Sequence, residues 1–266
     1  MITTQISEAK KFKFTTITAI SDTHTKHKQL TKDLIGGDLL LHCGDFTSVG
    51  YKHEVESFIN WFSKLDNYTH KVFIAGNHDL VFESEKRFDK FFQKFKHDNV
   101  LPVITDNKPQ WLLDILANLP ANVHYLENNS VTIDGVKIWG SPVSPTFANG
   151  WAFNVDRGYD INQVWCGIPD DSNIVMTHGP MLYHNDQLIN THVNIGCEQL
   201  YHRLLEVKPN LHFCGHIHYA YGYKRIFNSD GYSINASNLD ESYQYTNTPV
   251  TLDYDFENRD LIDFVQ

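Results

Sequence analysis

The chain has 266 residues, a formal net charge of −10 and 41% hydrophobic residues. This length and composition are typical of a globular protein with a sizeable core, arranged as one large domain or two small ones. The acidic balance disfavours a nucleic-acid partner, because proteins that bind polyanions usually carry a basic surface. It does not exclude a small phosphorylated substrate, provided that metal ions supply local positive charge.

Residues 1–13 contain no long apolar stretch, and we interpret them as an N-terminal arm without a signal peptide. No run approaches the ~20 apolar residues of a membrane span, so we expect a soluble cytoplasmic protein without a membrane partner. The four cysteines form no Cys-x-x-Cys pair, which disfavours a cysteine zinc site. Cys43 and Cys214 end apolar runs and are expected to be small, buried and reduced.

The first half of the chain alternates between predicted strands and helices. Short apolar runs predict buried, largely parallel strands. These strands are expected over residues 14–20, 39–43 and 71–75. Apolar residues at helical spacing predict amphipathic helices after them. These helices are expected over residues 51–65, 84–96 and 110–119, the last of them ending at Pro120.

The second half changes character and is expected to be mainly β. Asp134-Gly135, between two short apolar runs, is the signal of a two-residue type I′ hairpin. Residues 141–173 are rich in Pro, Gly, Asn and aromatic residues, and predict a long irregular excursion. Further strands are expected over residues 174–176, 211–214, 221–227, 232–235 and 250–254, with a helix over 198–207.

The order of these elements is α/β first and mostly antiparallel β later. It predicts a single domain over residues 1–266, with two packed sheets and helices outside them. Polar residues directly follow five of the apolar runs. These runs end at residues 20, 43, 75, 176 and 214.

Five polar clusters directly follow these runs. They read Asp22-Thr-His24, Gly44-Asp45, Gly76-Asn77-His78-Asp79, His178-Gly179 and Gly215-His216-Ile-His218. Each cluster alone is a weak signal. Ligands of open α/β sheets bind outside the carboxyl ends of strands, so the five loops are expected to form one site. Asp, His and Asn are the residue types that hold borderline divalent metals.

The other ten of the fifteen histidines have plainer interpretations. Eight of them fall in loops or on helix faces and are expected to be structural or solvated. They are His27, His53, His70, His97, His124, His184, His192 and His202. His42 and His212 lie within predicted strands beside the site, where satisfied core histidines are expected.

The ordered set D-x-H, G-D, G-N-H-D, H-G and G-H-x-H resembles the calcineurin-like metallophosphoesterase superfamily, over about residues 14–236. Five longer segments are similar to its metallophosphoesterase-domain-containing branch, which is related to class III cyclic-nucleotide phosphodiesterases. These segments are residues 41–47, 74–79, 149–154, 176–180 and 234–237. The resemblance implies a four-layer αββα sandwich of two mixed β-sheets flanked by helices.

Carried over onto this sequence, the resemblance implies two divalent metals. The first metal would be held by Asp22, His24 and His218, the second by Asn77, His178 and His216, and Asp45 would bridge them. His78 is not a ligand in the family and would protonate the leaving oxygen. Asp79 would orient the His78 ring and raise its basicity. Manganese is the expected metal, with iron and zinc as alternatives.

The implied activity is metal-dependent hydrolysis of a phosphoester, by attack of a metal-activated hydroxide on phosphorus without a phosphoenzyme. Small phosphodiesters such as cyclic nucleotides are the expected substrates. A phosphomonoesterase remains an alternative, because the same site can serve both ester classes. A non-catalytic scaffold that binds metal or nucleotide is a second alternative, although it would be marked by missing ligands. A nuclease ranks lower, since it would need a basic channel.

The sequence also departs from some relatives. Ser/Thr protein phosphatases follow their Gly-Asp loop with an Arg that binds phosphate, and residues 44–50 contain none, which disfavours a phosphoprotein substrate. Some members of the similar branch carry Gly at the position of His216 and are poor hydrolases that hold nucleoside monophosphate. The histidine present here favours an intact second metal site and an active enzyme.

The excursion over residues 141–173 is expected near the site and carries three residues of interest. Arg157 could reach a substrate phosphate, or be solvated or salt-bridged. Trp151 and Phe153 could stack on a base, or pack the excursion itself.

Overall fold

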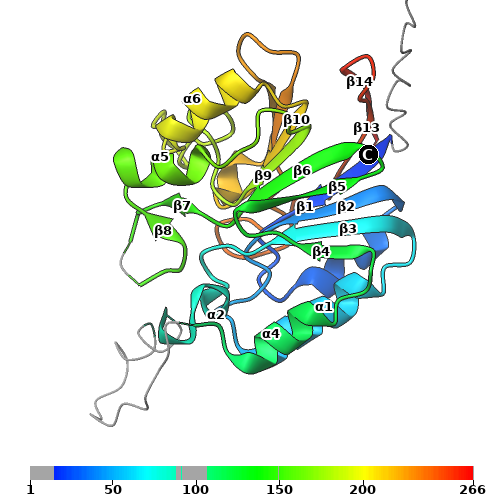
Figure 1. The fold of residues 1–266 in the computed structure, drawn as a ribbon, viewed down its shortest axis with the longest axis vertical. Helices are drawn as coiled ribbons and strands as arrows, with labels where there is room; N and C mark the ends of the chain where they lie inside the picture. The colour runs from blue at the N-terminus through cyan, green and yellow to red at the C-terminus, as the bar shows by residue number, and fades with distance from the viewer. Residues whose placement is uncertain (1–14, 88–90, 92–106, 149, 266) are drawn as a thin grey trace, which may run out of the picture.

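The structure is a computed structural model, and it describes residues 15–87, 91, 107–148 and 150–265. Its strands form two six-stranded sheets and one two-stranded sheet (Figure 1). The first sheet has the order β14-β13-β1-β2-β3-β4, and the second has the order β11-β12-β10-β9-β6-β5. Both sheets contain parallel and antiparallel pairs, so both are mixed.

The strands of the first sheet are β1 (Thr16–Ile20), β2 (Gly37–Cys43), β3 (Tyr68–Ile74), β4 (Val123–Tyr125), β13 (Val250–Asp255) and β14 (Asp260–Val265). Those of the second are β5 (Asn129–Ile133), β6 (Val136–Ser141), β9 (Ile174–Thr177), β10 (Leu211–Cys214), β11 (Gly222–Arg225) and β12 (Tyr232–Asn235). The helices are α1 (Lys52–Ser63), α2 (Leu80–Glu83), α4 (Gln110–Ala117), α5 (Tyr159–Trp165) and α6 (Glu198–Val207). Two 3₁₀ helices are η1 (His27–Asp33) and η2 (His218–Ala220).

The two large sheets pack face to face around an apolar core. Side chains alternate along each strand, so every second residue points between the sheets. In β2, Leu39 and Leu41 point into this inner core, whereas Leu40 points to the outer face. In β9, Ile174 and Met176 meet the same core from the other sheet. These strands are buried on both faces, which explains why their sequences are continuous apolar runs.

Helices cover the outer faces of both sheets (Figure 1). On the first sheet, Phe58 of α1 stacks on Phe46 with ring centroids 4.1 Å apart and meets Phe73 of β3 at 5.6 Å. On the second sheet, α5 and α6 pack on β6 and β9, with Trp165 of α5 beside Trp139 of β6. The layers therefore run helix, sheet, sheet, helix, and the expected αββα sandwich of two mixed sheets is confirmed.

The predicted hairpin is present, and the later strands are less uniform than expected. Asp134 and Gly135 both have positive φ, at 48° and 88°, as a type I′ turn requires. The pairs β11·β12 and β1·β13 are antiparallel, as expected, and β13 also pairs antiparallel with β14, a strand that was not expected. However, β12 runs parallel to β10, because β11 occupies the sheet edge and the chain then returns beside β10. The second sheet is thus parallel from β6 through β9 and β10 to β12.

Residues 141–173 are more regular than expected. They contain β7 (Ser144–Pro145) and β8 (Asn154–Val155), which pair with each other, and α5. Ile161 and Trp165 anchor α5 in the core outside the second sheet. A helix of only two turns has too few apolar positions to show a clear periodicity, so the sequence does not predict it. The excursion is therefore part of the packed fold.

Other predictions have mixed outcomes. The helix expected over residues 84–96 lies largely outside the described residues, of which 85–87 are helical. The N-terminal arm over residues 1–13 also lies outside them. All four cysteines are free, and Cys43, Cys197 and Cys214 are buried, whereas Cys166 is exposed. In the described part of the chain, the helices are too short or too polar to cross a membrane.

Trp165→Ala should lower the free energy of unfolding by about 3–5 kcal/mol. Trp165 is fully buried, and its Nε1 donates to Cys197 Sγ at 3.2 Å. Tyr159→Ala, on the same helix but at a 77% exposed position, is the control and should change it by less than about 0.5 kcal/mol. Urea denaturation measures both. Equal unfolding free energies would contradict the packing of α5 described above.

Candidate metal centre

The predicted site residues lie together at one edge of the two sheets. Strands β1, β2 and β3 run parallel, and so do β9 and β10, which brings their carboxyl ends to this edge. Backbone hydrogen bonds join the loops, since Asp22 N donates to Gly44 O at 3.0 Å and Gly215 N donates to His178 O at 2.9 Å. Three overlapping sets of side chains have their potential ligand atoms within 4.8 Å of one another. These sets are Asp22, His24 and His218; His24, Asp45 and His78; and Asp45, His178 and His216.

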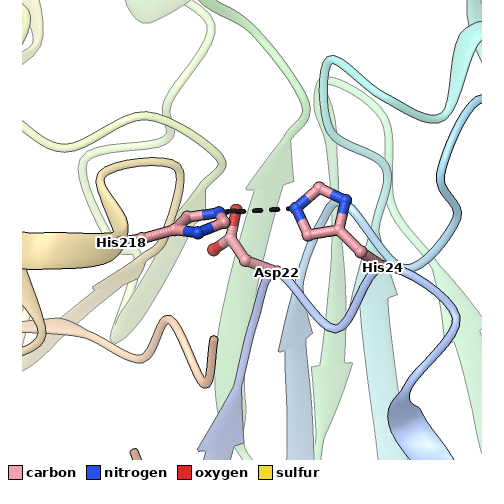
Figure 2. Close-up of side chains that lie close together, drawn as sticks. All are labelled: Asp22, His24 and His218. Atoms are coloured by element: carbon pink, nitrogen blue, oxygen red, sulfur yellow. Dashed lines mark hydrogen bonds and ion pairs between the residues drawn. The ribbon is translucent and has the colours of Figure 1, made fainter. Parts of the chain in front are cut away.

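The first set joins the loop after β1 to the loop after β10 (Figure 2). His24 Nε2 lies 3.4 Å from His218 Nε2, which lies 3.5 Å from Asp22 Oδ1. Asp22 is fully buried, and its Oδ2 accepts from the His216 N–H at 2.9 Å and from the Ser237 hydroxyl at 2.8 Å. Its Oδ1 has no hydrogen-bond partner among the described residues. A buried carboxylate oxygen without a partner is costly, so this position fits a cation.

The set of Asp45, His178 and His216, together with Asn77, joins the loops after β2, β3, β9 and β10. His178 Nε2 lies 2.9 Å from Asn77 Oδ1 and 3.3 Å from Asp45 Oδ2. The His216 ring lies 4.9 Å from the His178 ring, centroid to centroid. Asp45 Oδ2 also lies 3.9 Å from His24 Nε2, and this carboxylate therefore stands between the two sets.

Backbone carbonyls orient three of the histidines. His24 Nδ1 lies 3.2 Å from Thr47 O, His178 Nδ1 lies 2.9 Å from Cys43 O, and His218 Nδ1 lies 2.9 Å from Asp240 O. A carbonyl can only accept, so each Nδ1 carries a proton. In the neutral ring, Nε2 then presents a lone pair to the neighbouring acceptor atoms. Lone pairs that face one another at this spacing need a proton or a metal cation between them, and histidines held in this way are common metal ligands.

The electrostatics of the site favour bound positive charge. Burial would raise the pKa of Asp22, but its interaction with His218, whose Nε2 lies 3.5 Å from Oδ1, outweighs burial and holds that pKa well below its usual range. Burial also lowers the pKa of His24 to about 4, which keeps its ring neutral. Burial would lower the pKa of His178 and of His218. The carboxylate of Asp45 nevertheless raises the pKa of His178 to about 9, and that of Asp22 raises the pKa of His218 to about 9. A metal bound at these rings would compete with their protons.

Two glycines leave the space that the carboxylates occupy. A Cβ at Gly76 would lie 2.3 Å from Asp45 Oδ1, and one at Gly215 would lie 2.1 Å from Asp22 Oδ2. Three candidate ligands have a left-handed backbone conformation. Their φ angles are 52° at Asp22, 54° at Asp45 and 69° at His216. Such conformations are typical of functional sites, where surrounding contacts hold them.

Asp79 holds the loop of Asp45 and does not contact the ring of His78 through its carboxylate. That carboxylate accepts from the N–H groups of Asp45 and Thr47, both at 2.9 Å, and from the Thr47 hydroxyl at 2.6 Å. Burial, followed by the charge of Asp45, raises the pKa of Asp79 to about 8 against the effect of these donors. His78 Nδ1 lies 2.8 Å from Ser48 O. The orienting role expected of Asp79 thus belongs to a backbone carbonyl, because the donors of the loop already occupy the carboxylate.

The aromatic residues of the excursion pack rather than offer a free face. Trp151 lies against His78, with ring centroids 4.1 Å apart, and against Phe91 at 4.9 Å. Phe153 is buried in the core outside the first sheet. The interpretation that these residues pack the excursion is therefore favoured over stacking on a base. Arg157 lines a cavity beside His216.

The two strand histidines are satisfied core residues, as expected. The ring of His42 bonds the Thr23 hydroxyl at 2.9 Å and a backbone N–H of the next loop. The ring of His212 bonds the hydroxyls of Thr177 and Ser233, both at 2.8 Å. Burial lowers the pKa of both histidines to about 3, so they remain neutral.

Sequence reasoning missed several residues that contact the site. The Tyr243 ring lies 4.8 Å from that of His24 and 5.4 Å from that of His218, both edge to face. The ring centroids of Phe147 and His216 lie 4.9 Å apart. A lone aromatic residue in a polar loop belongs to no periodic pattern, so the sequence carried no signal for either. Ser237, which bonds Asp22, lies in a segment that the resemblance covered without giving it a role.

Comparisons with known proteins agree with this geometry. A profile of the family described as calcineurin-like phosphoesterase matches residues 15–220. The chain is 36% identical over 243 residues to metallophosphoesterase domain-containing protein 1 of Homo sapiens, covering 90% of this chain and 71% of that protein. It is 34% identical over 247 residues to UPF0046 protein T07D4.2 of Caenorhabditis elegans, covering 88% of this chain and 58% of that protein.

Solved structures share the fold at low sequence identity. TT1561 of Thermus thermophilus aligns with 96% of this chain and 99% of its own, with a TM-score of 0.60 and 14% identity. The match of the family profile and of the human relative confirms the resemblance inferred from the five clusters. The chain belongs to the calcineurin-like phosphoesterase family, in the branch of metallophosphoesterase domain-containing protein 1.

Proposed function

We propose that this chain is a binuclear metal-dependent phosphodiesterase that hydrolyses small phosphodiesters such as cyclic nucleotides. Its family supports metal-dependent phosphoester hydrolysis. The proposal adds the number of metals, their ligands and the class of ester. The single observation that carries it is the position of Asp45 between two sets of side chains that could hold a metal ion.

Asp45 is suited to bridge two metals. Its Oδ2 lies 3.9 Å from His24 Nε2 on one side and 3.3 Å from His178 Nε2 on the other. Asp22 and His218 would complete the first metal site, together with His24. The second would be completed by Asn77 and His216, together with His178. The Asp, His and Asn donors suit manganese, iron and zinc, and we propose manganese first.

The charge of such a centre would attract phosphate. Two divalent metals bring four positive charges, and the carboxylates of Asp22 and Asp45 return two negative charges. The remaining two positive charges are concentrated at one point of a chain whose formal net charge is −10. With both metals bound, a small phosphate anion would therefore be drawn to this edge, whereas an extended polyanion would meet an acidic protein around it.

When bound, the two metals would lower the pKa of a water molecule and neutralise charge on the phosphoryl oxygens. The chain supplies the remaining functions. Asn77 carries an amide that can donate to a phosphoryl oxygen. The Nδ1–H of His78 donates to Ser48 O and the ring lies against Trp151, so the imidazolium form would carry a second proton at Nε2 for the leaving oxygen. No side chain needs to form a covalent bond to phosphorus.

Two features of the sequence disfavour a protein phosphatase and a non-catalytic scaffold. The Gly-Asp loop lacks the Arg that protein phosphatases use, which disfavours a phosphoprotein substrate. A non-catalytic scaffold would be expected to lack ligands, and all seven expected ligand residues are present in the sequence.

Removal of metals should abolish hydrolysis, and Mn²⁺ should restore it. The chelated protein is reconstituted with Mn²⁺, Fe²⁺ or Zn²⁺, and hydrolysis of bis(4-nitrophenyl) phosphate is compared with that of 4-nitrophenyl phosphate. A panel of cyclic nucleotides then follows. Faster hydrolysis of the diester is expected. Faster hydrolysis of the monoester would identify a phosphomonoesterase, and no hydrolysis with metals bound would identify a scaffold.

Asp45→Asn should reduce turnover by about 100-fold or more and reduce the metal content, because the amide cannot bridge two cations as a carboxylate does. Elemental analysis and diester hydrolysis measure the two effects. Asp230→Asn is the control, since its side chain is 71% exposed on the surface. Full occupancy by two metals with near wild-type turnover in Asp45→Asn would refute the bridging role.

His216→Gly should lower turnover by more than the about 10–100-fold typical of residues that only support a ligand. Folding stability should be little changed, because glycine accepts the φ of 69° and keeps the N–H that donates to Asp22. Diester hydrolysis and thermal unfolding of the metal-free protein are measured together. Unchanged hydrolysis would remove His216 from the proposed metal site.

A further inference from the structure

Tyr243 covers the side of the candidate metal centre where His24 and His218 lie. Its ring centroid is 4.8 Å from that of His24 and 5.4 Å from that of His218, the two histidines drawn in Figure 2. The ring of His78 lies 4.5 Å from that of His24 and 6.4 Å from that of Tyr243, again between centroids. Tyr243 and His78 therefore flank the same candidate ligand, His24.

A short loop holds Tyr243 in this position. Asp240 O accepts the N–H of Tyr243 at 2.8 Å. The Asp240 carboxylate accepts the N–H groups of Ser242 at 2.9 Å and Gln244 at 2.8 Å. The carbonyl of Tyr243 accepts from Lys26 Nζ. Tyr243 adopts a left-handed φ of 58°, which is unfavourable for a bulky residue, so these contacts place the ring at a conformational cost.

Core packing does not account for this tyrosine. It is 42% exposed, and it belongs to none of the apolar cores formed by the described residues. In the described part of the chain its hydroxyl has no hydrogen-bond partner, whereas the hydroxyls of Tyr221 and Tyr245 bond Thr248 O and Asp33. The Tyr243 hydroxyl is therefore free to bond a ligand at the centre.

The charges around Tyr243 agree with a hydroxyl directed at the centre. Burial and then the carboxylates of Asp45 and Asp22 raise the pKa of Tyr243, and both carboxylates act more strongly than Glu241, only two residues away. The five polar clusters contain no Arg or Lys. A phosphoryl group at this centre would therefore be bound by the metals and by neutral or histidine donors.

We propose that Tyr243 is a catalytic residue whose hydroxyl donates a hydrogen bond to a phosphoryl oxygen of the substrate. This rests on the proposed function, because phosphorus is taken to lie at the centre around Asp45. His78 would give a proton to the leaving oxygen, whereas Tyr243 would bind an oxygen that stays on phosphorus. Phosphoryl transfer spreads negative charge over these oxygens, and a donor already held in place stabilises it without reorganisation. Tyr243 transfers no proton and forms no covalent bond.

Tyr243→Phe tests the hydroxyl separately from the ring, because phenylalanine keeps the ring contacts with His24 and His218. Isothermal titration of the Mn²⁺-loaded full chain with orthophosphate should show about 10–100-fold weaker binding, the loss typical of a hydrogen bond to a charged group. The kcat for bis(4-nitrophenyl) phosphate should fall by about 100-fold. The affinity of the metal-free chain for Mn²⁺ should be unchanged, since no ligand is altered.

Tyr223→Phe is the matched control, because Tyr223 is 52% exposed and its ring stacks on Phe264 of β14. This variant should bind orthophosphate and hydrolyse the diester like the wild type. Tyr243→Ala should weaken orthophosphate binding at least as much as Tyr243→Phe, because it lacks both the hydroxyl and the ring.

Unchanged orthophosphate affinity in Tyr243→Phe would overturn the proposal, because the ring alone would then account for the position of Tyr243. An equal loss of Mn²⁺ and orthophosphate affinity in that variant would also overturn it, since the hydroxyl would then act through the metal ligands. Hydrolysis is a separate readout. A chain that binds orthophosphate through Tyr243 but cleaves no ester would refute the proposed function and leave this contact standing.

Discussion

The burial of one carboxylate, that of Asp45, is the constraint on which the site depends. Its Oδ1 accepts the N–H of His78 at 2.7 Å, and its Oδ2 faces His24 and His178. A charge removed from water must be compensated on every side, or it would be neutralised by a proton. The partners come from different loops, and Gly76 must lack a side chain for the carboxylate to fit at all. The loops are therefore interdependent, because moving any one of them would expose the Asp45 carboxylate to water or leave it without a partner.

The sandwich explains how loops so distant in sequence meet. Parallel strands bring their carboxyl ends to one edge, and two sheets facing each other bring two such edges together. Asp22 and His218, from opposite sheets, are close enough to interact at 3.5 Å. The inner core between the sheets fixes their separation, because close-packed interiors do not shift freely. The excursion adds to this rigidity, since α5 is anchored by Trp165 in the outer core.

The five strands and the residues after them could be predicted because their signals are local. A continuous apolar run such as residues 39–41, followed by Gly44-Asp45, is visible without any knowledge of the fold. The groups that orient the site have no such signal. Thr47, Ser48 and Asp240 act through backbone carbonyls, which every residue carries. The role expected of Asp79 also differed from the structure. The family resemblance implied that it orients the His78 ring, whereas the turn aims the carboxylate at Thr47.

The main chain and the side chain of His216 have separate roles in the loop. The N–H that donates to Asp22 Oδ2 belongs to the main chain, so any residue could make this contact. The φ of 69° is one that glycine adopts more easily than histidine, so the imidazole is retained in a backbone conformation that works against it. The ring contributes little to packing beyond its contacts with His178 and Phe147. A protein that only held a nucleotide would gain stability by relaxing this position. The strain is accounted for when the ring itself takes part in the chemistry, which favours a hydrolase over a scaffold.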